Sequence, residues 1–99
     1  MRIIAVSTLR AFWARRGRSD AEQPLRTWVH IVKAAQWSNP AEVKKMFRSA
    51  DILPNERVVF NISGNKYRLV VAVHYRARRV FVRFVGTHTE YDKIDATKV

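Results

Sequence analysis

The chain has 99 residues and carries 19 lysines and arginines against 8 acidic residues, a formal net charge of +11. Its length and 47% hydrophobic content suit one small domain over residues 1–99 and argue against a second domain. The absence of cysteine excludes disulfides and thiol nucleophiles, and three scattered histidines predict no metal site and no cofactor. No uncharged stretch exceeds eight residues, so no membrane span is expected.

Residues 3–6 are apolar and predict a first strand, which a short helix follows. Ser7 or Thr8 is expected to cap this helix, and Gly17 suits its end. Its expected core residues are Leu9, Phe12 and Trp13. Residues 1–18 hold five arginines and no acid, as transit peptides do. Because removing them would delete the predicted strand, we favour a cytoplasmic protein that keeps this segment.

A second helix is predicted from a cap at Ser19 or Asp20 to about Trp37, with Pro24 in its first turn. The residues expected on its buried face are Leu25, Trp28, Val29, Val32 and Ala35. These positions favour tryptophans that pack in a core over tryptophans that stack on bases.

A third, shorter helix is predicted to open with Asn39 as its cap, Pro40 in its first position and Glu42 as a capping acid. The residues expected to point inward are Val43, Met46 and Phe47. The proline and asparagine at 54–55 are expected to end the helical half.

From residue 57 the hydrophobic period becomes two, which predicts a three-stranded antiparallel meander over residues 57–62, 66–75 and 79–86. Apolar residues must oppose apolar residues, because a slip of one position inverts both faces. The expected pairs are Ile62–Tyr67, Phe60–Leu69 and Val58–Val71, then Tyr75–Val80, Val73–Val82 and Val71–Phe84. The whole chain is therefore predicted to be one α+β unit.

This register places Arg68 opposite Asn61 and Arg83 opposite Ala72, so both arginines emerge on the face away from the helices. The other residues expected there are Val70, His74 and Phe81. An unpaired charge against an apolar surface costs several kcal/mol, so each arginine needs a counter-charge. Either a bound phosphodiester or the tail carboxylates can supply it, and the candidates in the tail are Glu90, Asp92 and Asp95.

Residues 57–89 contain seven lysines or arginines and no acid, which favours a polyanion such as nucleic acid as partner. A solvated basic face without a ligand is the alternative. After the meander, His88 and Tyr91 stand three residues apart, the spacing of side chains on one side of a helical turn. Both side chains can pass protons, although a lone histidine is more often a hydrogen-bonding residue than a catalyst.

Two strings, NISGNKYRLV at 61–70 and VRFVGTHTEYDKID at 82–95, resemble the HigB toxins of the RelE-like superfamily. Trp37, Pro40 and residues 47–51 resemble the middle portion of that family. The resemblance implies a RelE-like fold, with an N-terminal strand and helices packed on one face of an antiparallel sheet that ends in the meander.

The same resemblance implies an endoribonuclease that cuts mRNA, often on the ribosome, and so inhibits translation and growth. A cognate antitoxin, commonly HigA-like with a helix-turn-helix, would silence it, and only through that antitoxin would the toxin meet operator DNA.

The resemblance further implies cleavage without a metal, by attack of the ribose 2′-hydroxyl on the scissile phosphate. Arg68 and Arg83 are expected to stabilise that phosphate, while His88 and Tyr91 move protons, with the base and the acid undecided. Tyr91 can be a base only if cations lower its pKa, and the candidates are Lys66, Arg68, Arg83 and Lys93. Further RNA contacts are expected from Asn61, Lys66, Arg76, Arg78, Arg79 and Lys93.

A non-catalytic basic RNA-binding or ribosome-associated module is the competing function. Helices followed by a meander also occur in double-stranded-RNA-binding domains, but those bind with lysines at a helix start. Here the basic residues lie on strands and on a hairpin loop instead. RNA cleavage that is lost in Arg68→Ala would distinguish the enzyme from such a module.

Overall fold

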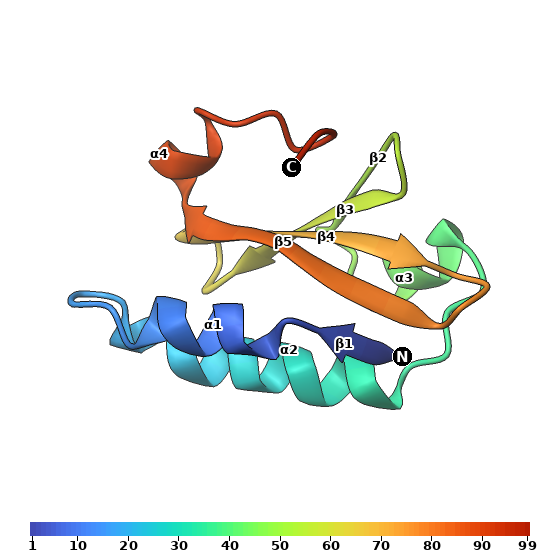
Figure 1. Ribbon diagram of the computed structural model, residues 1–99, viewed down its shortest axis with the longest axis horizontal. Helices are drawn as coiled ribbons and strands as arrows, with labels where there is room; N and C mark the ends of the chain where they lie inside the picture. The colour runs from blue at the N-terminus through green and yellow to red at the C-terminus, as the bar shows by residue number, and fades with distance from the viewer.

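The computed structural model describes residues 1–99 and contains one five-stranded sheet in the order β1-β5-β4-β3-β2 (Figure 1). Its strands are β1 Arg2–Ile4, β2 Asp51–Leu53, β3 Arg57–Ile62, β4 Tyr67–His74 and β5 Arg79–Thr87. β1 runs parallel to β5, and the other neighbours are antiparallel. The α+β class is confirmed, whereas the expectation of a purely antiparallel sheet is wrong. A short hairpin can join only antiparallel strands. β1 and β5 are instead separated by most of the chain, so their connection is long enough to allow parallel pairing.

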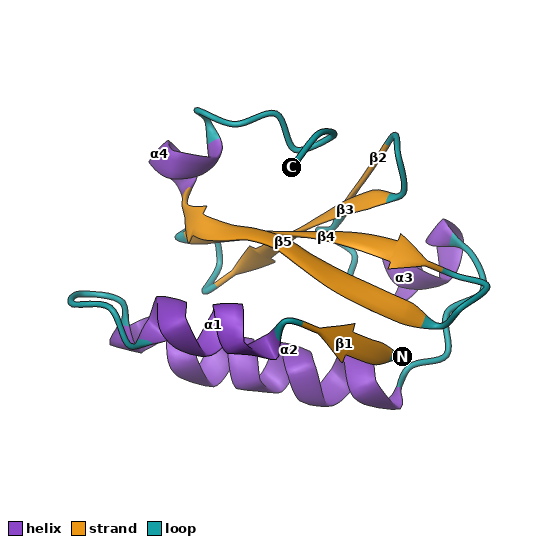
Figure 2. Cartoon of the chain, viewed as in Figure 1, coloured by secondary structure: helices purple, strands orange, loops and turns teal.

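Helices cover the sheet unequally (Figure 2). Their bounds are α1 Val6–Trp13, a 3₁₀ turn Ser19–Ala21, α2 Glu22–Ala34, α3 Pro40–Met46 and α4 His88–Tyr91. The pair α1 and α2 lies side by side along one face, called the helical face below, while α4 and residues 92–99 lie over the other, the outer face (Figure 1). None of the helices has the length and apolar character of a membrane span.

The first two helices begin without the side-chain caps that the sequence predicts. Ala5 takes a left-handed backbone conformation, φ 73°, and turns the chain from β1 directly into α1, so neither Ser7 nor Thr8 is the cap. Asp20 lies within the 3₁₀ turn and binds side chains of the sheet instead of capping α2. The expected end of α2 near Trp37 is also too late, because Ala35 is already extended.

The third helix begins as predicted, since Asn39 accepts a hydrogen bond from the Glu42 amide at 3.0 Å and Pro40 follows the cap. Val43 is buried, but Met46 is 51% exposed, which contradicts its predicted inward position. Phe47, just past the helix end, packs against Trp37 and Phe60, so the inward position at this end of α3 is filled by Phe47.

The register of the first hairpin is confirmed at all three expected pairs, and Asn61 faces Arg68. The second hairpin is shifted by two residues, because Val73 pairs with Val80 and Val71 with Val82. A bulge then interrupts the pairing, so that Val70 faces Phe84 and Arg83 has no partner. The predicted pairing of Arg83 with Ala72 is therefore wrong. Arg83 is the extra residue of this bulge. Beyond it, the residues of β5 that point to each face of the sheet differ from those that a strict period of two predicts.

The main core lies between the helical face and α1 to α3. Its largest fully buried side chains include Trp28, Tyr67, Phe60, Leu9, Leu25 and Leu69. A second, much smaller cluster lies on the outer face, where Val59 and Val70 contact Ala96 of the last residues. Each central strand thus has apolar contacts on both faces, but only the helical face carries an extensive core.

Candidate active site

Arg68 lies at the centre of a row that crosses three strands of the outer face. Its strand neighbours are Asn61 on β3 and Gly86 on β5. Because Gly86 has no side chain, nothing from β5 stands directly beside Arg68. A Cβ at Gly86 would come within 2.7 Å of the Phe84 ring and 3.1 Å of a Glu90 carboxylate oxygen, so the glycine also lets these side chains pack close.

The short helix α4 is fixed beside this row by a capping box. The Thr87 hydroxyl accepts from the Glu90 amide at 3.1 Å, and the Glu90 carboxylate accepts from the Thr87 amide at 2.9 Å. The hydrogen bond from the Thr87 backbone holds the pKa of Glu90 below its ordinary value. A Glu90 carboxylate oxygen also lies 3.7 Å from the guanidinium of Arg15, just past the end of α1, so the charge of Glu90 is directed to the helix cap and to Arg15 rather than to Arg68.

Tyr91, at the end of α4, lies over Arg68, with 6.0 Å between the guanidinium and the ring centroid. The same ring packs 6.4 Å from Phe84, in the outer cluster. Burial raises the pKa of Tyr91 above its ordinary 10.0, Asp51 adds to the increase, and Arg68 opposes it only in part. The expectation that cations lower this pKa is therefore wrong. The phenol keeps its proton at neutral pH and suits a hydrogen-bond or proton donor.

His88 begins α4 and is exposed. Its Nε2 lies 3.4 Å from a carboxylate oxygen of Asp92, one helical turn later. A carboxylate within this distance of an imidazole can orient the ring, which is the arrangement of a positioned base. The predicted proton carriers His88 and Tyr91 thus lie at opposite ends of one helical turn.

Neither Arg68 nor Arg83 forms an ion pair. The tail carboxylates that could have neutralised them bind elsewhere: Asp92 faces His88, and Asp95 binds Thr97 and Lys98. Arg68 donates one hydrogen bond, to the Asn65 carbonyl oxygen at 3.3 Å. The explanation by tail carboxylates is therefore excluded, and the donors of both guanidinium groups are largely free for an anion.

The observed register differs from the predicted one in placing Arg83 one residue nearer to the Arg68 row, since the prediction opposed Arg83 to Ala72, four residues from Arg68. Arg83 lies at the bulge, three residues before Gly86 and so about 10 Å along β5 from the row. Its guanidinium lies 5.5 Å from the ring centroid of Phe81, which places it on the outer face. The predicted face is thus kept while the predicted neighbours differ.

The other expected RNA ligands are dispersed. Lys66 forms an ion pair with Asp20, which also accepts from the Tyr67 hydroxyl, and this contact raises the pKa of the lysine and lowers that of the carboxyl. Lys93 follows α4 and is exposed. The hairpin arginines, Arg76, Arg78 and Arg79, lie at the far end of β4, about 20 Å along the strand from Arg68. Only Asn61 and Arg68 share the row, and Tyr91 lies over it.

Sequence reasoning missed the residues that position this site. Gly86 and the Thr87–Glu90 capping box hold α4, yet neither was among the predicted site residues. The signal was present, because a threonine followed three residues later by glutamate is the capping-box pattern. Asp51, which helps to raise the pKa of Tyr91, was missed because its strand β2 was not predicted. Three residues are too few for a strand period to be recognised.

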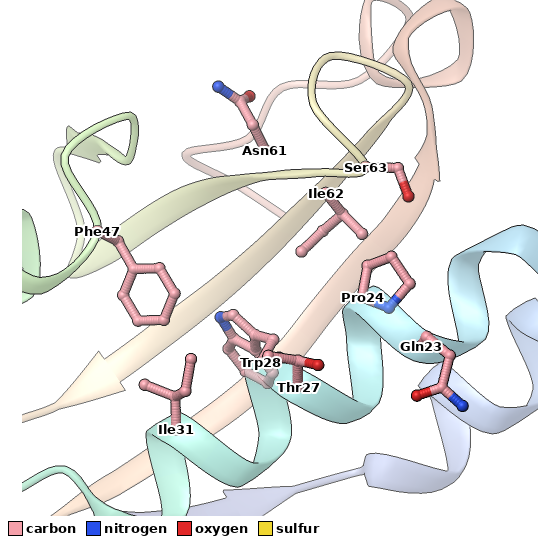
Figure 3. A pocket seen from close by; sticks show the side chains of 9 residues that line it. All are labelled: Gln23, Pro24, Thr27, Trp28, Ile31, Phe47, Asn61, Ile62 and Ser63. Atoms are coloured by element: carbon pink, nitrogen blue, oxygen red, sulfur yellow. The ribbon is translucent and has the colours of Figure 1, made fainter.

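A groove of about 410 Å³ opens on the helical side of the β3 end (Figure 3). The side chains that line it are Gln23, Pro24, Thr27, Trp28, Ile31, Phe47, Asn61, Ile62 and Ser63. None of them is titratable, and the Asn61 side chain points away from the groove (Figure 3). The groove and the Arg68 row are therefore different features, and acid–base chemistry belongs to the row.

Fold and site together define a small basic α+β protein that exposes an unpaired arginine beneath a tyrosine on one face of its sheet. A family model for HigB toxins, described as the RelE-like toxic component of a toxin–antitoxin system, matches residues 21–94. The chain therefore belongs to the HigB toxin family, and this membership implies an antitoxin as partner. The family resemblance of the two sequence strings is thus confirmed.

Curated relatives agree with this assignment. The mRNA interferase HigB of Escherichia coli O6:H1 is 29% identical over 83 residues, covering 82% of this chain and 80% of the relative. The mRNA interferase toxin HigB of Escherichia coli K12 is 34% identical over 65 residues, covering 64% of this chain and 62% of the relative. A HigB of Shigella flexneri matches with the same figures.

Proposed function

We propose that this chain is a RelE-like endoribonuclease that cleaves mRNA, the activity in the names of its relatives. The observation that carries the proposal is Arg68, a half-exposed arginine without a carboxylate partner, placed beneath Tyr91. A phosphodiester fits the guanidinium fork with two charge-assisted hydrogen bonds. The net charge of +11 supplies the long-range attraction for RNA.

In the proposed reaction the ribose 2′-oxygen attacks the adjacent phosphorus. The new O2′–P bond forms as the P–O5′ bond breaks, so the products are a 2′,3′-cyclic phosphate and a 5′-hydroxyl. His88, oriented by Asp92, accepts the proton of the 2′-hydroxyl. Tyr91, whose raised pKa keeps it protonated, donates to the leaving 5′-oxygen. No metal or cofactor enters this scheme.

Arg68 stabilises the charge that develops on the phosphoryl oxygens, where preorganised donors have their largest effect. Arg83 provides a second cation about 10 Å along β5, within reach of an adjacent part of the substrate. The remaining RNA contacts are proposed at Asn61, Lys66, Arg76, Arg78, Arg79 and Lys93. Lys66 can bind an RNA phosphate only if its ammonium group leaves Asp20 or contacts Asp20 and the phosphate at the same time.

The partners follow from the family and from the charge. The antitoxin is proposed to be an acidic, HigA-like helix-turn-helix protein that covers the Arg68 row or keeps the toxin from the ribosome. Operator DNA is contacted through that antitoxin alone. If charge dominates the complex, its affinity falls as salt increases, because exposed charges are screened over about 8–10 Å. An affinity that does not change with salt would indicate a hydrophobic interface instead.

The decisive experiment incubates the purified chain with a defined RNA and analyses the product ends. We expect 2′,3′-cyclic phosphate and 5′-hydroxyl termini with EDTA present, and no cleavage when the nucleotide 5′ to the cut carries a 2′-deoxyribose. Expression of the chain alone should arrest growth and translation. Cleavage of the deoxy substrate, or activity only with added divalent metal, would refute the mechanism. RNA binding without any cleavage would instead support the non-catalytic module.

A further inference from the structure

An aromatic pair is exposed on the outer face at the end of the sheet remote from α4. His74 of β4 and Phe81 of β5 are both partly exposed, and their ring centroids lie 4.8 Å apart with planes inclined by 52°. Arg83 adds a third flat group, 5.5 Å from the Phe81 centroid. We call His74, Phe81 and Arg83 the aromatic platform. The outer cluster around Val70, against which Ile94 and Val99 of the last residues pack, does not include Phe81.

Unpaired cations surround the platform. His74 faces Arg79 across the strands, and the hairpin loop beyond them carries Arg76 and Arg78. A hollow of about 530 Å³ beside this loop is lined by Met1, Arg2, Gln36, Ala77, Arg78 and Arg79. None of the arginines at this end forms an ion pair. This end of the molecule therefore combines exposed aromatic surface with uncompensated positive charge.

A second arginine in the same molecule also lies over an aromatic ring and can be compared with Arg83. Arg26 lies 5.0 Å from the ring centroid of Trp13, but Glu22 binds its Nε at 2.8 Å. That arginine is neutralised within its own helix. Arg83 stacks in a similar way and has no carboxylate, so its charge and the aromatic face are both available to a polyanion.

We propose that the aromatic platform is a second RNA-binding site, at which a base of single-stranded RNA stacks while the hairpin arginines bind neighbouring phosphates. This inference rests on the proposed function and extends it, because it defines a substrate segment outside the cleaved bond. The platform extends from about 10 Å (Arg83) to about 20 Å (His74) along the strands from the Arg68 row, so RNA that spans both sites must extend over several nucleotides. An acidic polypeptide would satisfy the arginines but would leave the ring faces unused.

Binding of an uncleavable RNA tests the platform without relying on catalysis. The probe is a fluorescein-labelled oligouridylate of about ten nucleotides with 2′-O-methyl riboses. We expect Phe81→Leu, which keeps an apolar side chain on the strand, to bind about tenfold more weakly, as loss of one stacked base predicts. Phe81→Tyr should restore the affinity, and His74→Ala should weaken it. Denaturant unfolding of each variant shows that the fold is retained.

The matched control is Trp13→Leu, which removes an arginine-stacked, partly exposed aromatic from the helical side of the molecule. It should bind the probe like the parent chain. Equal losses in Trp13→Leu and Phe81→Leu would overturn the platform, because the effect would then be general.

Other outcomes separate this inference from the proposed function. If the parent chain cleaves no RNA but Phe81→Leu still weakens probe binding, the platform stands and the nuclease proposal fails. If Phe81→Leu binds the probe normally, the platform is wrong whether or not the chain is a nuclease. Loss of binding to an oligoglutamate peptide, with RNA binding intact, would overturn it in favour of an acidic protein partner.

Discussion

On the helical face of the sheet, Trp28 and Phe60 pack edge to face, 5.5 Å apart, within a continuous apolar core. On the outer face of the same strands, a few apolar contacts around Val70 adjoin the unpaired Arg68 and the half-buried Tyr91. Successive residues of one strand point to opposite faces, so a single stretch of chain supplies both. Substitutions on the helical face should therefore lower stability, and substitutions on the outer face should lower activity.

The largest effect is expected on the helical face. Trp28 is 2% exposed, and Trp28→Ala should lower the free energy of unfolding by about 3–5 kcal/mol, since it leaves a cavity beside Phe60. Denaturant unfolding measures this loss. Trp13→Ala, at a partly exposed position, should cost clearly less. Equal costs at the two positions would show that burial does not set the difference.

On the outer face, Arg68→Ala should reduce RNA cleavage by roughly a hundredfold or more, as loss of one transition-state donor does, while the unfolding transition stays unchanged. Arg68→Lys should recover only part of the rate, because lysine keeps the charge but loses the planar fork. Single-turnover cleavage and denaturant unfolding give the two quantities. A rate loss that tracks a loss of stability would contradict the division between the faces.

Tyr91→Phe tests the proton donor and should lower the cleavage rate by up to about a hundredfold with little change in RNA affinity. Because the pKa of Tyr91 lies above 10.0, the parent rate should lose this contribution only as pH rises past that value. The pH–rate profile under single-turnover conditions provides the measurement. A rate that increases up to that pH, and ceases to do so in Tyr91→Phe, would identify the phenolate as a base instead.

The smallest effect concerns the ion pair between Asp20 and Lys66, which joins the helical layer to the start of β4. The hydrogen bond from Lys66 lowers the folded-state pKa of Asp20 below 3.8, so its stabilisation is present above that pH and lost as pH falls through the lowered value. Asp20→Asn should flatten the acid-induced fall in unfolding free energy. Asp51→Asn, which removes an exposed carboxylate without an ion pair, should leave this fall in place.

The first hairpin shows how much of the fold the sequence can predict. Strand β3 was predicted with its observed bounds, and its register with β4 is correct, because the alternation from Val58 to Ile62 leaves one way to bury the apolar set. The face of Arg68 and its neighbour Asn61 follow from that register. The Asn39 cap of α3 was also predictable, since its signal lies within four residues.

The second hairpin depended on tertiary context. The bulge next to Arg83 cannot be read from a period of two, because an extra residue changes the alternation without leaving a gap in the sequence. The parallel pairing of β1 and the short strand β2 likewise depend on partners distant in the chain. A strand of three residues carries too little periodicity to predict its own pairing.

By itself, the sequence determined the α+β class, the basic charge, the first hairpin and the toxin family, because each depends on local periodicity, composition or matching strings. Only the tertiary structure decided the electrostatics of the site. It directed the tail carboxylates away from Arg68 and buried enough of Tyr91 to raise its pKa. Both outcomes depend on which distant groups lie within a few ångströms, and long-range packing of the chain sets those distances.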